Sequence, residues 1–178
     1  AARNPEVAFV VSLAGCAQRG DSLLLMQNRA ILTVRGMPDS SVDAYVGVLR
    51  DIFRLQERYP PEFLRSHRDS LAGVLFPKGP RASLPAPMRR NALAVLTMRQ
   101  GAWMRFFKRN DPEPYIRAAR CPVLAINGTT DVQVDAAINL GLIRKYASEG
   151  GNQRVTVKAY EGLNHLFQHA ETGAAGEY

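Results

Sequence analysis

The chain has 178 residues, of which 46% are hydrophobic and 22% charged, a composition typical of a globular domain with a sizeable core. No apolar run approaches the roughly 20 residues that a membrane-spanning helix needs, so we expect no membrane span. The formal net charge of +7 raises the question of nucleic-acid binding. However, the basic residues are scattered, and the densest doublet, Arg89-Arg90, has no interleaved aromatic residues, so we expect no nucleic-acid partner.

Residues 7–13 form a near-continuous apolar run rich in β-branched side chains, which predicts a strand buried on both faces of a sheet. The preceding residues 1–5 are typical of the last turn of a helix, with Pro5 at its end. The sequence therefore predicts a helix that begins before residue 1 and leads into a core strand.

From Gln18 to Pro114 the pattern is helical. Ser40 or Ser41 can cap a helix whose apolar residues recur with a period of 3.6, namely Val42, Tyr45, Val46, Leu49, Ile52 and Phe53. Further helices are expected around residues 63–71 and over residues 88–107, with His67 packed or hydrogen-bonded on the apolar side of the first. A crossover between parallel strands needs only about a dozen residues, so we interpret residues 18–114 as a helical cap inserted over one end of a sheet.

Strand patterns return at residues 123–127 and 154–160, with a helix between them over residues 135–149 that ends at Gly150-Gly151. The predicted fold class is α/β: the last strands of a doubly wound, mostly parallel sheet with an inserted helical cap. The predicted divisions are a core strand in residues 1–17, the cap in residues 18–114, and a C-terminal core in residues 115–178.

Two chemically active side chains follow the last two predicted strands. Asp131 comes just after the strand at residues 123–127, and His165 comes just after the strand at residues 154–160. The carboxyl ends of parallel strands meet at one edge of a sheet, where ligands gather. There Asp131 can accept a hydrogen bond from a histidine Nδ1–H, which is the acid–base part of a nucleophilic hydrolase. Asp135 competes for this role but stands at the start of a helix, where it fits better as an N-cap.

The chain shows no nucleophile to accompany this pair. No Ser or Cys has Gly both two residues before and two residues after it, so a nucleophile elbow is absent. Gly20-Asp21-Ser22-Leu23 spells the nucleophile block of the GDSL hydrolases, but Gly162 stands where that family needs Asp, three residues before His165. This departure argues against a GDSL hydrolase, but Ser22 stays an alternative nucleophile.

Other residues support weaker hypotheses. Trp103, Phe106 and Phe107 form an aromatic-rich stretch, which is either core or a cap surface that contacts an acyl group. His169 is spaced for a shared metal with His165, but no third ligand is nearby, so we expect no metal. Cys16 and Cys121 are predicted near opposite sheet edges, too far apart for a disulfide.

Taken together, these segments resemble the C-terminal half of bacterial α/β-hydrolases of the esterase-like branch with a helical cap. The matching segments are the sixth core strand (residues 4–15), the start of the cap (21–27), the return from the cap (107–112), the acid strand and loop (121–134) and the histidine loop (162–168). By this resemblance Asp131 is the triad acid and His165 the triad base. The serine, its elbow and the oxyanion-hole amides would lie before Ala1, in a missing N-terminal half of the same fold.

The resemblance implies a carboxylic ester hydrolase that acts on a small-molecule acyl ester without a metal or an organic cofactor. The upstream serine would attack the acyl carbon, His165 would take and return the proton, and Asp131 would orient His165. Two alternatives stay open: a catalytically inactive binding or interaction module, and a peptidase on the same fold. The compartment, cytoplasmic or secreted, is not indicated by the sequence.

Overall fold

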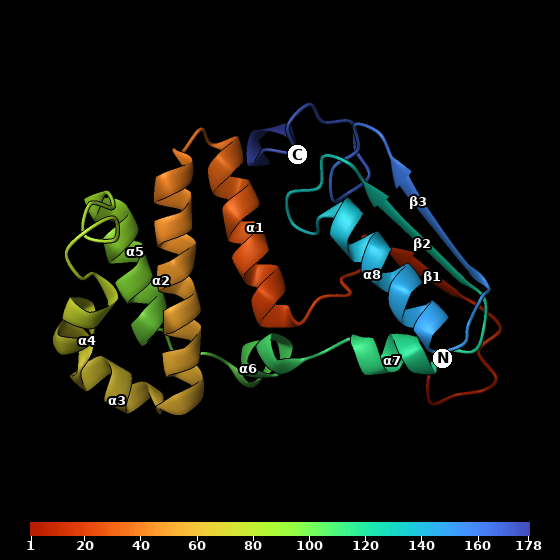
Figure 1. Cartoon of the computed structure of the whole chain (residues 1–178), viewed down its shortest axis with the longest axis horizontal. Coiled ribbons are helices and arrows are strands. Elements are labelled where there is room, and N and C mark those ends of the chain that lie inside the picture. Colours follow the sequence, from red (N-terminus) through yellow and green to blue (C-terminus); the bar gives the residue numbers. More distant parts are fainter. The chain divides into compact units, whose positions relative to one another are not determined.

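A computed structural model describes residues 1–178 and divides them into two compact units. The first, which we call the sheet unit, contains Ala1–Val34 and Phe107–Tyr178. The second, which we call the helical unit, is Arg35–Phe106. In sequence, the helical unit is thus inserted between the two stretches that build the sheet unit (Figure 1).

The sheet unit is built on three parallel strands in the order β1-β2-β3. Their bounds are Val10–Leu13 (β1), Val123–Gly128 (β2) and Val155–Tyr160 (β3). The register places Val10 opposite Val123 and Val123 opposite Val155. Because all three strands run the same way, their carboxyl ends lie at one edge. The α/β class and the parallel sheet predicted from the sequence are therefore confirmed.

The first strand is shorter than predicted, and residues 1–6 form turns instead of a helical turn. The N–H of Val10 donates to the carbonyl of Pro122 at 2.9 Å, which is the first bond between β1 and the chain of β2. In a parallel ladder the next bond back would need an N–H from residue 122. Proline has none, so the pairing cannot extend toward residue 7.

Helix α8 (Ala136–Glu149) lies against one face of the sheet and packs on β2 and β3 (Figure 1). The core between them is made of the buried residues Ala17, Ala125, Ala136, Leu140 and Ile143. The Asp135 carboxylate caps the helix by accepting from the Ile138 N–H at 2.8 Å, as predicted. On the sheet face away from α8, Val11, Leu13 and Leu124 are 46%, 62% and 39% exposed.

The sheet unit also contains α1 (Gly20–Val34), α7 (Glu113–Ala118) and a short helical turn at Ala175–Glu177, and α6 (Ala102–Arg109) spans the boundary between the units. The first residue of α1 joins the two stretches of the unit. The N–H of Gly20 donates to the Asn110 carbonyl at 3.1 Å, and a Cβ on Gly20 would lie 1.9 Å from the Phe107 carbonyl oxygen. Only glycine permits this close approach.

The helical unit contains α2 (Asp39–Arg58), α3 (Pro61–Ser66), α4 (Arg68–Leu75) and α5 (Ala86–Thr97). Helix α2 packs against α5. Five of the six residues of the predicted apolar stripe are buried, namely Val42, Tyr45, Val46, Leu49 and Ile52. The Asn91 side-chain amide donates to the Tyr45 hydroxyl at 2.6 Å, so the one polar atom that this stripe carries has a partner.

Three details of the predicted helices are wrong. Ser40 and Ser41 lie inside the first turn of α2, whose N-cap residue is Pro38 and which has no side-chain cap. The helix expected around residues 63–71 breaks at His67 into α3 and α4. His67 is exposed at this break, but its ring stacks on Phe63 and its Nδ1 lies 3.0 Å from the Phe63 carbonyl oxygen, so the prediction of a packed or hydrogen-bonded histidine is confirmed.

The third error is the helix expected over residues 88–107, which is broken between α5 and α6. The Gln56 side-chain amide donates to the Val95 carbonyl at 2.7 Å, and the Gln100 side chain donates to Gln56 in turn. These bonds give a carbonyl group in the last turn of α5 a hydrogen-bond partner, and they hold the residues that follow out of the helix. The break thus coincides with a tertiary contact, and the local sequence does not encode that contact.

Candidate active site

The acid loop, residues 128–134, leaves the carboxyl end of β2. Asn127, the buried fifth residue of β2, folds it: its side-chain amide donates to the Val134 carbonyl and its side-chain oxygen accepts from the Gly128 N–H, both at 2.8 Å. Asp131 Oδ1 then accepts from the N–H groups of Gln133 and Val134 at 2.8 and 2.9 Å. One oxygen of the carboxylate is therefore held by backbone, which fixes where the other oxygen points.

The histidine loop, residues 161–169, leaves the carboxyl end of β3 and is tied to the acid loop. The Gly162 N–H donates to the Thr129 hydroxyl at 3.0 Å, and the Thr130 N–H donates to the Leu163 carbonyl at 3.1 Å. A Cβ on Gly128 would lie 1.9 Å from that same Leu163 oxygen. The two loops can approach this closely only because residue 128 has no side chain.

These contacts bring Asp131 and His165 together. Asp131 Oδ2 lies 2.9 Å from His165 Nδ1. The Asp131 side chain has no exposed surface, whereas the His165 side chain is 28% exposed. With Nδ1 on the carboxylate, Nε2 is the imidazole nitrogen left to exchange a proton with another group. This is the arrangement in which a carboxylate sets the tautomer of a histidine and stabilises the imidazolium ion.

The other candidate residues lie elsewhere. Ser22 is in the first turn of α1, and its hydroxyl is 3.4 Å from the carboxylate of Asp21. Asp21 also pairs with Arg19 at 3.2 Å. The hydroxyl of Ser22 thus contacts an acid, and no structural contact connects it with a histidine. Asp135 is engaged as the cap of α8.

The aromatic stretch lies on α6. Trp103 and Phe106 belong to the helical unit and have exposed side chains, and Phe107 is the first residue of the second stretch of the sheet unit. Cys16 and Cys121 are free thiols, as predicted, and burial raises the pKa of the Cys16 thiol. No group of three or more His, Cys, Asp or Glu side chains is arranged to hold a metal ion.

Two site residues were missed by the sequence analysis: Asn127 and Asn164. Both are at most 1% exposed, and both bond to the backbone of the loops that carry Asp131 and His165. The available signal was a polar amide at the end of an apolar strand, in the case of Asn127. An amide side chain buried there needs partners, and the partners available are loop backbone groups.

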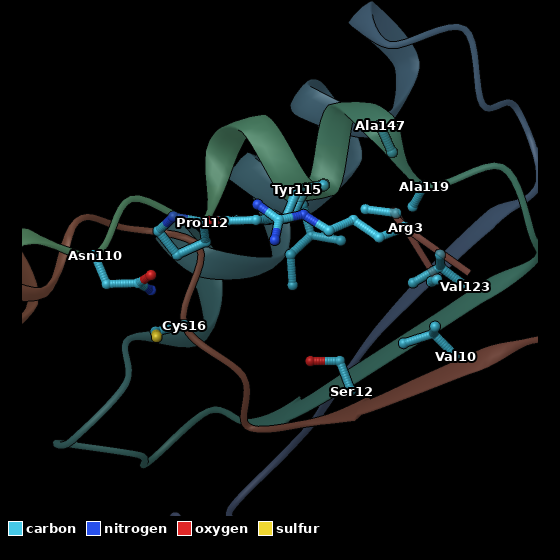
Figure 2. Close-up of a pocket in the computed structure, with 14 residues that line it drawn as sticks. Arg3, Val10, Ser12, Cys16, Asn110, Pro112, Tyr115, Ala119, Val123 and Ala147 are labelled. Atoms are coloured by element: carbon cyan, nitrogen blue, oxygen red, sulfur yellow. The ribbon is translucent and has the colours of Figure 1, made fainter. Parts of the chain in front are cut away.

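A separate cavity of about 570 Å³ lies on the sheet face that carries α8 (Figure 2). Figure 2 shows Val10, Ser12 and Val123 of the strands along its floor and Tyr115 of α7 above them. The Arg3 guanidinium reaches across the cavity, 5.6 Å from the centre of the Tyr115 ring. Asp131 and His165 do not line this cavity. A smaller cavity of about 300 Å³, between α1 and the acid loop, is lined in part by Asp131.

The fold and the site define an α/β protein with a carboxylate–imidazole pair at the carboxyl edge of a parallel sheet. Comparisons with protein families, with curated proteins and with solved structures found no match for the chain. None of its helices combines the length and the apolar character needed to cross a membrane.

Proposed function

We propose that this chain supplies the acid and the base of a serine hydrolase that acts on carboxylic esters. The observation that carries the proposal is the 2.9 Å contact between Asp131 Oδ2 and His165 Nδ1, made by a carboxylate with no exposed surface. A carboxylate that is both buried and held by backbone N–H groups is suited to orient a histidine, because it has little freedom to leave the imidazole.

The proposed nucleophile is a serine outside residues 1–178, in an N-terminal half of the α/β-hydrolase fold that the sequence resembles. Two features of the sheet support this. Strand β1 has a neighbouring strand on one side only, and the face bearing Val11, Leu13 and Leu124 is uncovered. Parallel sheets in α/β proteins have both faces covered, so further strand and helix segments fit at this edge and face.

In the proposed reaction the serine oxygen attacks the acyl carbon of the ester, and its proton passes to Nε2 of His165. Collapse of the tetrahedral intermediate breaks the bond to the alcohol oxygen, which takes the proton from His165. Water then repeats the sequence on the acyl-enzyme and releases the carboxylic acid. No metal or organic cofactor is required. The role of Trp103, Phe106 and Phe107 in binding the acyl group stays a prediction from the sequence.

The test is the intact mass of the purified protein before and after a fluorophosphonate probe, which reacts only with an activated serine. We expect one adduct on a species heavier than the 19.6 kDa of this chain. An adduct on the 19.6 kDa chain itself would overturn the proposed origin of the nucleophile and direct attention to Ser22. Preference for peptide anilides over p-nitrophenyl esters would replace the esterase by a peptidase.

The acid and the base are tested by substitution in the same active species. We expect Asp131→Asn and His165→Ala each to lower kcat by about 10³–10⁴, because either change removes the oriented base. His169→Ala is the matched control, since His169 lies in the same loop but outside the pair, and it should leave kcat nearly unchanged. Near-normal turnover of either pair variant would remove that residue from the mechanism.

The cavity of Figure 2 favours a second candidate function, a binding module without catalysis. Its volume lies within the range of small-molecule sites, most of its lining is apolar, and it contains one guanidinium group, that of Arg3. This combination suits an apolar ligand with a carboxylate. Titration followed by NMR should then show tighter binding of octanoate than of octanol, and Arg3→Gln should abolish the difference. Equal binding of the two probes would contradict this candidate.

A further inference from the structure

Asn164, the residue before His165, is completely buried. Its side-chain oxygen accepts from the N–H groups of Leu166 and Gln168, at 2.9 and 3.0 Å. Its own N–H donates to the Gln168 carbonyl at 2.9 Å, and its carbonyl accepts from the Phe167 N–H at 3.0 Å. Four hydrogen bonds of one residue therefore close the turn that presents His165.

One residue of this turn, Phe167, has an unfavourable backbone conformation. Phe167 has a φ of 59°, in the left-handed region that is costly for a residue with a bulky side chain. Such a conformation persists only where the surroundings fix it, and the N–H groups on both sides of Phe167 donate to the Asn164 side chain. If the Asn164 oxygen were absent, both N–H groups would lose this partner and the turn would be free to relax.

The two ends of the Asn164 side chain are unequal. Its oxygen accepts two hydrogen bonds, whereas its buried amide nitrogen has no partner. What the side chain contributes to the turn is therefore its acceptor oxygen and not its amide hydrogens. A side chain of the same shape that keeps the oxygen should preserve the turn, and one that lacks the oxygen should not.

We infer that Asn164 is a positioning residue, whose side-chain oxygen holds His165 Nδ1 on the Asp131 carboxylate. The inference deepens the proposed function, because it concerns the same acid–base pair, and it rests on that function for its catalytic meaning. Its test does not depend on catalysis, since the hydrogen bond between His165 and Asp131 can be observed directly.

The experiment is proton NMR of the full 178-residue chain, observing the downfield resonance of the His165 Nδ1–H. The resonance is assigned by its loss in His165→Gln and in Asp131→Asn. We expect it to be lost or shifted to that of a solvent-exposed imidazole in Asn164→Leu, and to be retained in Asn164→Asp, which keeps the acceptor oxygen. The Asp variant tests the inference even if the Leu variant does not fold.

A second buried asparagine provides the matched control. Asn152 is 5% exposed, its side-chain oxygen accepts from the Arg154 N–H at 3.0 Å, and its amide donates to the Cys121 carbonyl at 2.8 Å, at the opposite end of the strands. Asn152→Leu should lower the melting temperature and leave the His165 resonance in place. A structural role alone would make the Asn152 and Asn164 variants alike.

The outcomes separate this inference from the function on which it rests. Retention of the resonance in folded Asn164→Leu, or its loss in folded Asn164→Asp or Asn152→Leu, would overturn the positioning role. Absence of the resonance from the unmodified chain would overturn the acid–base pair, and the inference with it. If the resonance behaves as expected while the fluorophosphonate probe finds no activated serine, the positioning role stands and the hydrolase proposal fails.

Discussion

At the scale of single residues, the two oxygens of Asp131 have different partners. Oδ1 accepts from two backbone N–H groups and Oδ2 contacts His165. The positions of Asp131 and His165 could be predicted, because the residues after successive parallel strands meet at one edge of a sheet. The roles of Asn127 and Asn164 could not, because their partners are loop backbone groups whose positions no periodic pattern encodes.

Gly128 should be intolerant of a side chain. Its Cβ would lie 1.9 Å from the Leu163 oxygen, so Gly128→Ala must force the acid and histidine loops apart. We expect a loss of about 1–3 kcal/mol in the free energy of unfolding, measured by urea denaturation. Gly141→Ala is the control: this residue lies in α8 with open space around its Cβ, and the change should stabilise by about 0.5–1 kcal/mol. Equal effects of the two changes would contradict the close approach of the loops.

Glu177 should make the C-terminal turn sensitive to acid. The Thr172 hydroxyl donates to its carboxylate at 2.8 Å, and this bond, with those from the Thr172 and Gly173 N–H groups, lowers the pKa of Glu177 below its ordinary value of 4.5. Because the pKa is lowered in the folded state, the stabilisation from these bonds is fully present above the ordinary pKa and is lost as the pH falls through the lowered pKa. Amide exchange at Gly173, corrected for its intrinsic pH dependence, should therefore accelerate in acid, whereas Glu177→Gln should show no such step.

At the scale of elements, α8 and the three strands were predictable, and several helix ends were not. Apolar periodicity and β-branched runs are local signals, and so is a carboxylate at the start of a helix. The break after α5 depends instead on Gln56, which lies in another helix and bonds to the Val95 carbonyl. A single sequence contains no signal for that pairing.

The cap of α8 gives a test at this scale. Asp135→Ala removes the acceptor for the Ile138 N–H and should cost about 1 kcal/mol in the free energy of unfolding, measured by urea denaturation. Ser40→Ala should change it by less than about 0.5 kcal/mol, because no side chain caps α2. A large effect of the Ser40 change would reinstate the cap that the sequence predicts and the structure lacks.

At the scale of the whole molecule, the helical unit has a core of its own. Val42, Val48, Ile52, Leu64 and Leu96 are each at most 2% exposed, and all lie within Arg35–Phe106. Sequence periodicity alone placed the helical region at residues 18–114, whereas the compact unit begins at Arg35 and α1 is grouped with the sheet. Periodicity identifies a helix but not the compact unit to which the helix belongs.

The helical unit should therefore fold by itself. A polypeptide of residues 35–106 is expected to show a helical circular dichroism spectrum and a cooperative thermal transition. A weak and gradual transition would mean that the unit needs the rest of the chain. Ile52→Ala in the same polypeptide is the control, because loss of a fully buried side chain should lower the transition temperature clearly.

The parallel register also has a consequence for folding. The pairing of Val123 with Val155 closes a short stretch of chain around α8, whereas the pairing of Val10 with Val123 must close a loop that contains α1 and the whole helical unit. By loop length alone the second closure costs about 1 kcal/mol more in chain entropy. Asp131 and His165 follow β2 and β3, the two strands whose pairing has the lower cost in chain entropy. The acid–base pair thus belongs to the pairing with the shorter sequence separation, and it can assemble before β1 joins the sheet.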